Sequence, residues 1–310
     1  MTLMDPLESI LVNVDATASA HPALARAIRL ARVSGATLTV VDVVTVPPYA
    51  RRYLPADVEA EMLTTRREQL MRIAHAVTEV ATDAKLLTGR PGTALIQEVL
   101  RSRHDLLMRS HARDSTASGP KPFGTVDMEL LRKCPCPVLL VRPGAKERPG
   151  IAGAVNASTE EPAEGALNLK IAEWTLLMAR LEGGIPVLLQ AWAPFGERAV
   201  RRHASDEAFA AYVEDVRSRT ANDLRQLAQS LGGRLAETQT VHRRGEPEDV
   251  IPEYVAAGGV DLVVMGTVAR GGIAGLLFGN TAERVMRKLL CSVLAVKPDG
   301  FVSPVRLDPA

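Results

Sequence analysis

Glycine is concentrated in one short stretch near the carboxyl end of the chain, between two apolar segments. Within Asp261–Lys297, an apolar run typical of a buried strand leads into the glycines, a helical pattern opens near Asn280, and a second apolar run follows. Glycine has no Cβ, so backbone amides there can approach a ligand closely. The free N–H groups and positive dipole end of a helix that opens at this point face the same space. The pattern indicates an anion site, above all for a phosphate group, and its glycines are Gly266, Gly271, Gly272, Gly275 and Gly279.

A simpler interpretation is that these glycines only let a surface loop turn tightly. Their number, and the helix start directly behind them, favour the anion site. Arg270 lies inside the loop and is placed to pair with a phosphate, although a solvated side chain is the commoner state of a loop arginine.

Composition excludes several classes of protein. Lys+Arg 37 against Asp+Glu 36 leaves a net charge of +1, which gives no basic surface for nucleic acid or for an anionic membrane. No apolar run approaches the roughly 20 residues that cross a bilayer, and the first residues do not resemble a secretory signal. The three cysteines, Cys134, Cys136 and Cys291, favour a reducing compartment. We therefore expect a soluble, cytoplasmic protein with neither a nucleic-acid nor a membrane partner.

Motifs for catalysis or metal binding are missing from the sequence. It contains no arrangement typical of a Ser/His/Asp triad, no HExxH motif and no P-loop. Between Thr267 and Thr281 there is no Asp, Glu or His that could act as a base. Cys134 and Cys136 are separated by one residue, whereas zinc sites usually separate cysteines by two to four and need four ligands. We therefore expect no enzymatic activity and no metal site, with the cysteines packed as small apolar residues.

The order of the predicted elements is repeated along the chain. Each copy has a strand, a helix, a strand, a long helix and three further strands with helices between them. The long helices are expected at Pro55–Val80 and Asp206–Leu231, and the first helix of the second copy at Leu167–Leu181. Alternating strands and helices indicate an α/β fold with a parallel sheet covered on both faces. A polar linker after Pro143 separates two domains, which we place at residues 1–143 and 150–310.

Several segments of both copies resemble the universal stress protein family. Its members carry a nucleotide loop, G-x-x-G, nine residues and then G-[S/T], after strand four; the equivalent here runs from Gly266 through Ala269 to Gly279 and Asn280. The segments similar to the tandem-domain, E-type branch are AVNASTEEPAEGALNLKI, LLRKCP, MGTVARGGI, GNTAERV and KPDGFVSPVRL, so the resemblance covers nearly the whole chain. It implies two tandem doubly wound parallel-sheet domains, Rossmann-like and of the adenine nucleotide alpha hydrolase type.

The resemblance also implies a ligand and the residues that hold it. A non-catalytic stress-response protein would bind an adenine nucleotide, ATP or AMP with magnesium, in the second domain. Three positions differ from the family pattern: Asn156 replaces the usual Asp after strand one, Ala269 the second glycine, and Asn280 the Ser or Thr. The implied site comprises Asn156, Ala191, Gly266, Thr267, Ala269, Arg270, Gly279, Asn280 and Thr281.

The first copy retains little of the loop. It keeps Asp15 after strand one, but Arg109 stands near the first glycine position and only Gly124-Thr125 survives of the motif. We expect this half not to bind nucleotide in the family manner and to pair instead with the second half. In the family, strand five of one unit pairs with strand five of another, so Val138–Val141 and Val293–Val296 would join in an intrachain pseudo-dimer, with further homodimerisation left open.

Two alternatives remain at this level. The first is a larger amphipathic ligand, lipid-like or a nucleotide sugar; it is suggested by the altered positions and by the apolar loop residues Ile273, Leu276, Leu277 and Phe278. The second is weak ATP hydrolysis, which the missing base in the loop disfavours.

Overall fold

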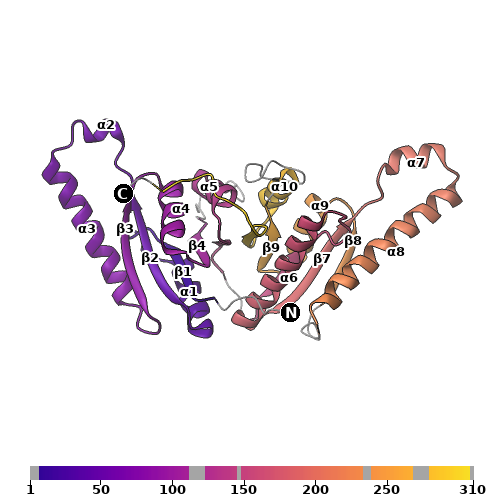
Figure 1. The fold of residues 1–310 in the computed structure, drawn as a ribbon, viewed down its shortest axis with the longest axis horizontal. Coiled ribbons are helices and arrows are strands. Elements are labelled where there is room, and N and C mark those ends of the chain that lie inside the picture. The colour runs from indigo at the N-terminus through magenta and orange to yellow at the C-terminus, as the bar shows by residue number, and fades with distance from the viewer. Residues whose placement is uncertain (1–6, 112–122, 145–147, 233–238, 268–278, 308–310) are drawn as a thin grey trace.

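The computed structural model describes residues 7–111, 123–144, 148–232, 239–267 and 279–307 (Figure 1). Ten strands form one continuous sheet in the order β3-β2-β1-β4-β5-β10-β9-β6-β7-β8. The strands are β1 (Ser9–Asn13), β2 (Thr37–Val44), β3 (Thr82–Thr88), β4 (Leu106–Ser110), β5 (Val138–Val141), β6 (Gly150–Ala154), β7 (Ile185–Trp192), β8 (Gln239–Arg244), β9 (Leu262–Gly266) and β10 (Ser292–Val296).

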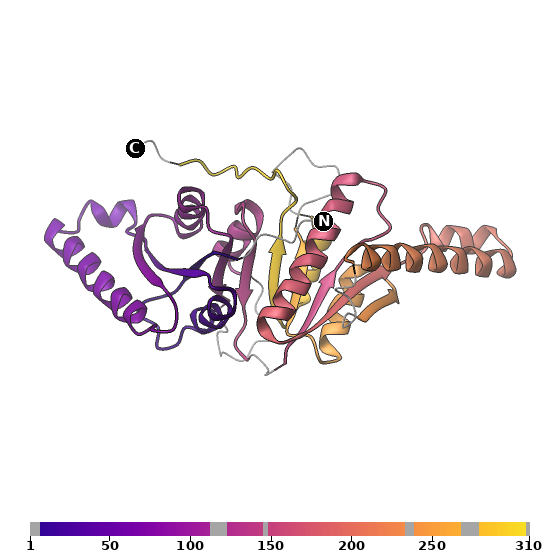
Figure 2. The ribbon, with the colours of Figure 1, turned by 60° about the horizontal axis from the view of Figure 1, so that its bottom comes forward.

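Helices cover both faces of the sheet. One apolar cluster contains residues of α1, α3, α6 and α8, and the other contains residues of α4, α5, α9 and α10, so each half is a doubly wound α/β unit (Figure 2). The helices are α1 (Pro22–Ser34), α2 (Pro48–Arg51), α3 (Ala56–His75), α4 (Pro91–Ser102), α5 (Thr125–Lys133), α6 (Pro162–Glu182), α7 (Glu197–His203), α8 (Asp206–Ser230), α9 (Pro247–Ala256) and α10 (Asn280–Lys288).

Local sequence explains where the first helix of each half begins and ends. Pro22 and Pro162 occupy the first turns of α1 and α6, where a missing N–H removes no hydrogen bond. Gly35 and Gly183 end the same helices in the left-handed conformation, with φ of 81° and 61°. Glycine adopts this conformation without a steric penalty.

Several helix boundaries differ from the sequence-based expectation. Helix α6 begins at Pro162 rather than Leu167, because its first turns are small and polar and show no apolar period. Helix α3 ends at His75, short of Val80. Helices α2 and α7 were not predicted; α2 has only 4 residues, and α7 has no buried residue and hence no apolar stripe.

The two halves join through the expected strands. Strand β10 pairs with β5 antiparallel, with Leu294 opposite Leu139, and all other neighbouring strand pairs of the sheet are parallel. The segment after β10 then runs back across the first half, where the Gln97 Nε2 donates to the Arg306 carbonyl oxygen at 2.9 Å (Figure 2). The halves are therefore tied by a continuous sheet and by the carboxyl-terminal segment.

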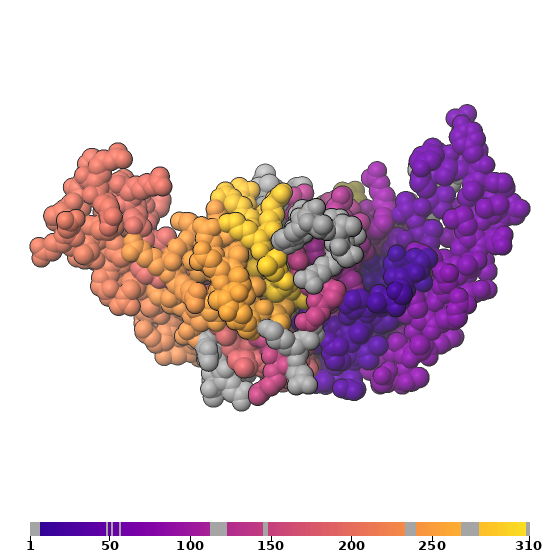
Figure 3. Space-filling model, turned by 180° about the vertical axis from the view of Figure 1, so that it is seen from behind, coloured from indigo at the N-terminus to yellow at the C-terminus, as the bar shows by residue number. Residues whose placement is uncertain are grey.

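The outer ends of the molecule rise above its centre. Seen from behind, α7–α8 at one end and α2–α3 at the other stand away from the central body, and the surface between them is hollowed (Figure 3). Among the helices that the structure describes, none is long and apolar enough to cross a membrane.

Candidate functional site

The order of strands reverses in the second half between β6 and β9. Strand β6 pairs with β7 on one side and with β9 on the other, so the chain leaves these two strands in opposite directions. Ligands of open α/β sheets bind outside the carboxyl ends of the strands at such a point. Gly266 ends β9, and Asn156 follows the end of β6 by two residues, so the structure brings these two predicted residues to the same edge.

A hydrogen bond closes the base of the glycine-rich loop. The Gly279 N–H donates to the Thr267 carbonyl oxygen at 3.1 Å, which brings the two ends of the loop together at the first turn of α10. Gly279 is the N-cap of this helix, and no side-chain hydrogen bond caps it in the described part of the chain. Asn280 and Thr281 are exposed in the first turn. The free N–H groups of α10 thus face the carboxyl edge of the sheet.

Part of the predicted site lies outside the described residues. These positions are Ala269, Arg270, Gly271, Gly272, Ile273, Gly275, Leu276, Leu277 and Phe278. Gly266 is described, and it has a packing role of its own: a Cβ built there would lie 2.8 Å from the Leu167 Cδ2 of α6. Glycine at this position therefore lets α6 approach the end of β9.

Asn156 is held by the first turns of α6. Its backbone N–H donates to the Asn168 Oδ1 at 2.9 Å, and its carbonyl oxygen accepts from the Asn168 Nδ2 at 2.7 Å. Its side-chain Nδ2 donates to the Glu164 Oε1 at 3.0 Å. Sequence reasoning missed Asn168 and Glu164, although their spacing of four residues places them on one helix face. The amide of Asn156 is therefore oriented by the protein itself.

The predicted adenine-packing position lies on β7. Ala191 is half-buried and packs against the apolar cluster of the α9 and α10 face, which is compatible with both sheet core and ligand contact. Its neighbour Trp192 stacks on His242, with ring centroids 5.3 Å apart and an interplanar angle of 9°.

A buried lysine contacts the base of the glycine-rich loop. Lys297, at the end of β10, is 3% exposed. Its Nζ donates to the Thr267 Oγ1 at 2.5 Å and to the carbonyl oxygen of Leu131 in α5, and it lies 5.0 Å from the centre of the Phe301 ring. Burial lowers the pKa of Lys297 to about 8. This residue was not predicted; it connects the first half, the loop base and the carboxyl-terminal segment.

In the first half, a carboxylate occupies the corresponding helix start. Asp127 in the first turn of α5 accepts from the Arg109 Nε at 2.9 Å and contacts the His111 Nδ1 at 2.9 Å, and the Gly124 N–H donates to it at 3.3 Å. Burial raises the pKa of Asp127. The hydrogen bond with His111 and the charge of Arg109 lower this pKa, and together the lowering effects outweigh burial, so the net shift is downward. The anion at this helix start is supplied by the chain itself.

Strand register corrects one position of the first copy. Ser110 pairs with Val141 in β5, as Gly266 pairs with Val296 in β10, so Ser110 rather than Arg109 is the counterpart of the loop glycine. Arg109 instead points to Asn13 and Asp127.

Asp15 of the first copy is engaged by a neighbouring helix. Arg66 of α3 forms ion pairs with Asp15 at 3.0 Å and with the buried Asp42 at 2.6 Å. Hydrogen bonds from Thr17 and the charge of Arg66 lower the pKa of Asp15. The carboxylate that would hold a ligand in the family manner is therefore paired within the protein.

Comparison with known proteins decides the family. The model of the universal stress protein family matches residues 6–142 and 166–297. The chain belongs to the universal stress protein family. Universal stress protein E of Escherichia coli K12 is 32% identical over 317 residues, covering 97% of each chain, which agrees with the expected E-type branch.

Solved structures share the whole tandem fold. A protein of unknown function from Pseudomonas aeruginosa PAO1 has a TM-score of 0.68 at 22% identity, covering 95% of this chain and 94% of its own. A universal stress protein from Archaeoglobus fulgidus has a TM-score of 0.62 at 14% identity, covering 93% and 98%. At these identities the comparisons establish the fold, which the two copies in the sequence had indicated.

The cysteines of this universal stress protein are buried thiols. The Cys134 and Cys136 sulfurs lie 3.6 Å apart, and no group of three or more His, Cys, Asp or Glu that could hold a metal occurs within the described ranges. The hydrogen bond with Cys134 and burial raise the pKa of Cys136, and burial raises that of Cys291 to about 12. Protonated thiols are poor metal ligands and nucleophiles, so the geometry favours a packing role.

Proposed function

We propose that this protein is a non-catalytic stress-response protein that binds an adenine nucleotide, ATP or AMP, in its second domain, residues 150–310. The observation that carries the proposal is the hydrogen bond from the Gly279 N–H to the Thr267 carbonyl oxygen, because it joins both ends of the loop to the start of α10. A helix start with free N–H groups at the carboxyl edge of a parallel sheet suits a phosphate.

The contrast between the halves supports placing the ligand in the second one. Gly124 and Gly279 are the N-caps of α5 and α10, at corresponding positions. In the first half, Asp127 supplies a carboxylate beside Gly124, so a phosphate there would meet a negative charge. No side chain of the described residues caps α10 in this way.

The proposed ligand residues are Asn156, Ala191, Gly266, Thr267, Ala269, Arg270, Gly279, Asn280 and Thr281. Asn156 fits a contact to the sugar or base, since its carbonyl and amide groups are fixed by Asn168 and Glu164. Magnesium would be held chiefly by the phosphates, as is usual for this ion, because the described residues contain no cluster of carboxylates for it.

Calorimetric titration with ATP, ADP and AMP in the presence of magnesium tests the proposal. Gly279→Arg should abolish binding, because its side chain would fill the space before α10. Gly124→Arg is the matched control in the first half: a Cβ there has no neighbour closer than the Asp127 Oδ2 at 3.8 Å, so binding should persist. Failure of all three nucleotides to bind the wild-type protein would refute the proposal. Phosphate release that Gly279→Arg abolishes would show catalysis instead.

A further inference from the structure

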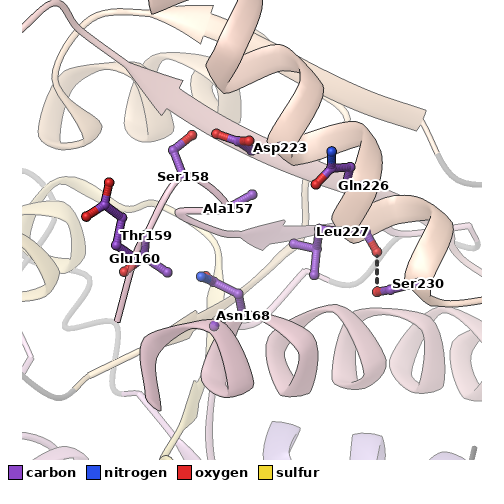
Figure 4. A pocket seen from close by; sticks show the side chains of 10 residues that line it. Ala157, Ser158, Thr159, Glu160, Asn168, Asp223, Gln226, Leu227 and Ser230 are labelled. Carbon is purple, nitrogen blue, oxygen red and sulfur yellow. Dashed lines mark hydrogen bonds between the residues drawn. The ribbon is translucent and has the colours of Figure 1, made fainter. Parts of the chain in front are cut away.

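A cavity lies in the second half, on the face of the sheet that α6 and α8 cover. It is bounded by the segment after β6, by the start of α6 and by α8 (Figure 4). Its volume is about 490 Å³, within the range of small-molecule pockets. Of the residues from Gly266 to Thr281 that the structure describes (266–267 and 279–281), none lines it. On α6, Leu167 faces Gly266, whereas the next residue, Asn168, lines the cavity.

Among the residues that the structure describes, the lining carries negative charge and no positive charge. It includes the carboxylates of Glu160 and Asp223 and the polar side chains of Ser158 and Gln226, and none of these described residues is Lys, Arg or His. Asp223 projects from α8 toward Ser158 (Figure 4). A phosphate would be repelled here, so the cavity is unsuited to the charged end of a nucleotide.

The arginines nearest to Asp223 along α8 have other partners. Arg219, one turn earlier, forms an ion pair with Asp215 at 2.9 Å. Arg225 donates to the Asn222 Oδ1 at 2.9 Å. In the described parts of the chain, no ion pair neutralises Asp223, which is half-buried. An unneutralised carboxylate in a cavity wall favours a cationic ligand.

A buried amide behind the wall has unused hydrogen-bonding capacity. Gln190 of β7 is 1% exposed, and its Nε2 donates to the Ser158 Oγ at 3.0 Å. Its Oε1 has no hydrogen-bond partner among the described residues. Exchanging the two amide atoms would leave the nitrogen without an acceptor instead. A buried amide atom without a partner is costly, and Ser158, the partner of the Gln190 Nε2, lines the cavity.

We propose that this cavity binds a small aliphatic amine. Asp223 and Glu160 supply the counter-charges for protonated amino groups, and the Ser158 hydroxyl, which accepts from the Gln190 amide, lines the same cavity. Leu227 and Ala157 supply apolar wall for the methylene groups between the nitrogens. The inference does not rest on nucleotide binding, because it concerns a ligand of opposite charge; Asn168 connects the two places, since it lines this cavity and also holds Asn156.

The test is calorimetry of the full-length protein with 1,4-diaminobutane at physiological ionic strength, beside 1,4-butanediol, which has the same chain length and no charge. Saturable binding of one diamine, without binding of the diol, is the expected result. Asp223→Asn should weaken diamine binding about tenfold or more, the usual effect of removing a charged hydrogen-bond partner. Gly165→Leu should abolish it by filling the cavity from α6.

Two matched variants control for fold and for non-specific charge. A Cβ at Gly165 meets no atom within 4 Å, so Gly165→Ala should bind the diamine like the wild type. Glu68→Gln removes an exposed carboxylate from α3 and should also leave binding unchanged. Equal binding of diamine and diol, equal diamine binding in every variant, or absence of saturation would overturn the proposal. Displacement of the diamine by AMP would also overturn it, because the cavity would then belong to the nucleotide site.

Discussion

The Arg26 guanidinium and the Glu182 carboxylate form a buried ion pair that joins the two halves of the chain. The Arg26 Nη2 donates to both carboxylate oxygens, at 2.8 and 2.9 Å, and its Nε donates to one of them at 3.0 Å. The two side chains are 5% and 8% exposed. The remaining Nη1 donates to the Ser292 Oγ of β10 at 2.9 Å, so all three guanidinium nitrogens have a hydrogen-bond partner.

This ion pair occurs once, although the halves are related by a pseudo-twofold axis. Arg26 lies nine positions before the helix cap Gly35, and Trp174 lies nine positions before the corresponding cap Gly183. Glu182 directly precedes its cap, where the first half has a serine. Two first halves would therefore leave Arg26 without a carboxylate, and two second halves would leave Glu182 without a cation. The pair favours association of unlike halves.

Removing one partner of this pair should destabilise the protein strongly. Arg26→Met leaves the Glu182 carboxylate buried without a cation, and Glu182→Met leaves the guanidinium without an anion. Each should lower the free energy of unfolding by about 3–5 kcal/mol, and the double variant should lose clearly less than the sum, because no charge is then stranded. Urea unfolding of all four proteins measures this.

The exposed ion pair of Arg219 and Asp215 provides the comparison for the double-mutant cycle of Arg26 and Glu182. Their side chains are 77% and 54% exposed, so Arg219→Met should change the stability by less than about 1 kcal/mol. Additive effects of the Arg26 and Glu182 substitutions would show that the pair contributes no coupling between the halves.

The parts of the fold that could be predicted from the sequence are the buried ones, because burial leaves an apolar pattern in the sequence. Strands such as Thr37–Val44 and Val293–Val296 are apolar runs because helices cover both faces of the sheet. The pairing of β5 with β10 was predicted from the resemblance to the family, in which strand five of one unit pairs with strand five of another. Helix α7 escaped prediction because it buries nothing, and the start of α6 because its first turns are small and polar.

The candidate site was predictable only in outline. The glycines and the helix start at Asn280 mark the loop directly in the sequence. The supporting residues do not. Lys297 reaches Leu131 in the other half of the chain, and Asn168 and Asp127 bind segments whose positions depend on the folded sheet. A buried lysine in a strand pattern is indistinguishable from an exposed strand end until the neighbouring half is in place.

Lys297 should make the protein more stable as the pH rises on the alkaline side. Its folded pKa of about 8 lies below the ordinary value of 10.5. Between these values the unfolded chain binds more protons than the folded one, so this residue makes the protein more stable as the pH rises from 8 to 10.5. The gain is on the order of 3 kcal/mol when complete. Urea unfolding at several pH values should show it in the wild type and not in Lys297→Met.

Lys288→Met is the control for general alkaline effects. Its side chain is 50% exposed and pairs with Asp249 at 2.7 Å. The variant should keep the wild-type dependence between pH 8 and 10.5. A Lys297→Met protein with an unchanged alkaline slope would mean that the ammonium is more hydrated than its 3% exposure indicates.

Asp127 should stabilise the first half at neutral pH and lose this effect in acid. Its folded pKa lies below the ordinary 3.8, so the contribution is present above that pH and disappears as the pH falls through the folded value. Asp127→Asn should therefore be less stable than the wild type at pH 7, and the difference should shrink below about pH 4. Urea unfolding at several pH values measures the difference, with Asp83→Asn on the edge strand β3 as the comparison for removal of a carboxylate.

Gly153 sets the distance between β6 and α6, and its replacement should loosen both. A Cβ at this position would overlap the Thr175 Oγ1 and lie 3.2 Å from the Leu188 Cδ2. Thr175 is fully buried, and its hydroxyl donates to the Ile171 carbonyl oxygen at 2.8 Å, so the side chain cannot simply rotate away. Gly153→Ala should lower the free energy of unfolding by about 1–3 kcal/mol.

A second substitution tests whether the loss of stability comes from the overlap with Thr175 or from any substitution in β6. Thr175→Ala removes the overlapping hydroxyl, so the double variant with Gly153→Ala should regain part of the lost stability in urea unfolding. Gly165→Ala makes the same chemical change in α6, where a Cβ meets no atom within 4 Å, and should cost nothing. If Gly153→Ala were as stable as the wild type, α6 would have to stand farther from the sheet. The hydrogen bonds between Asn168 and Asn156 depend on the distance between α6 and the sheet, so Gly153→Ala should also weaken nucleotide binding.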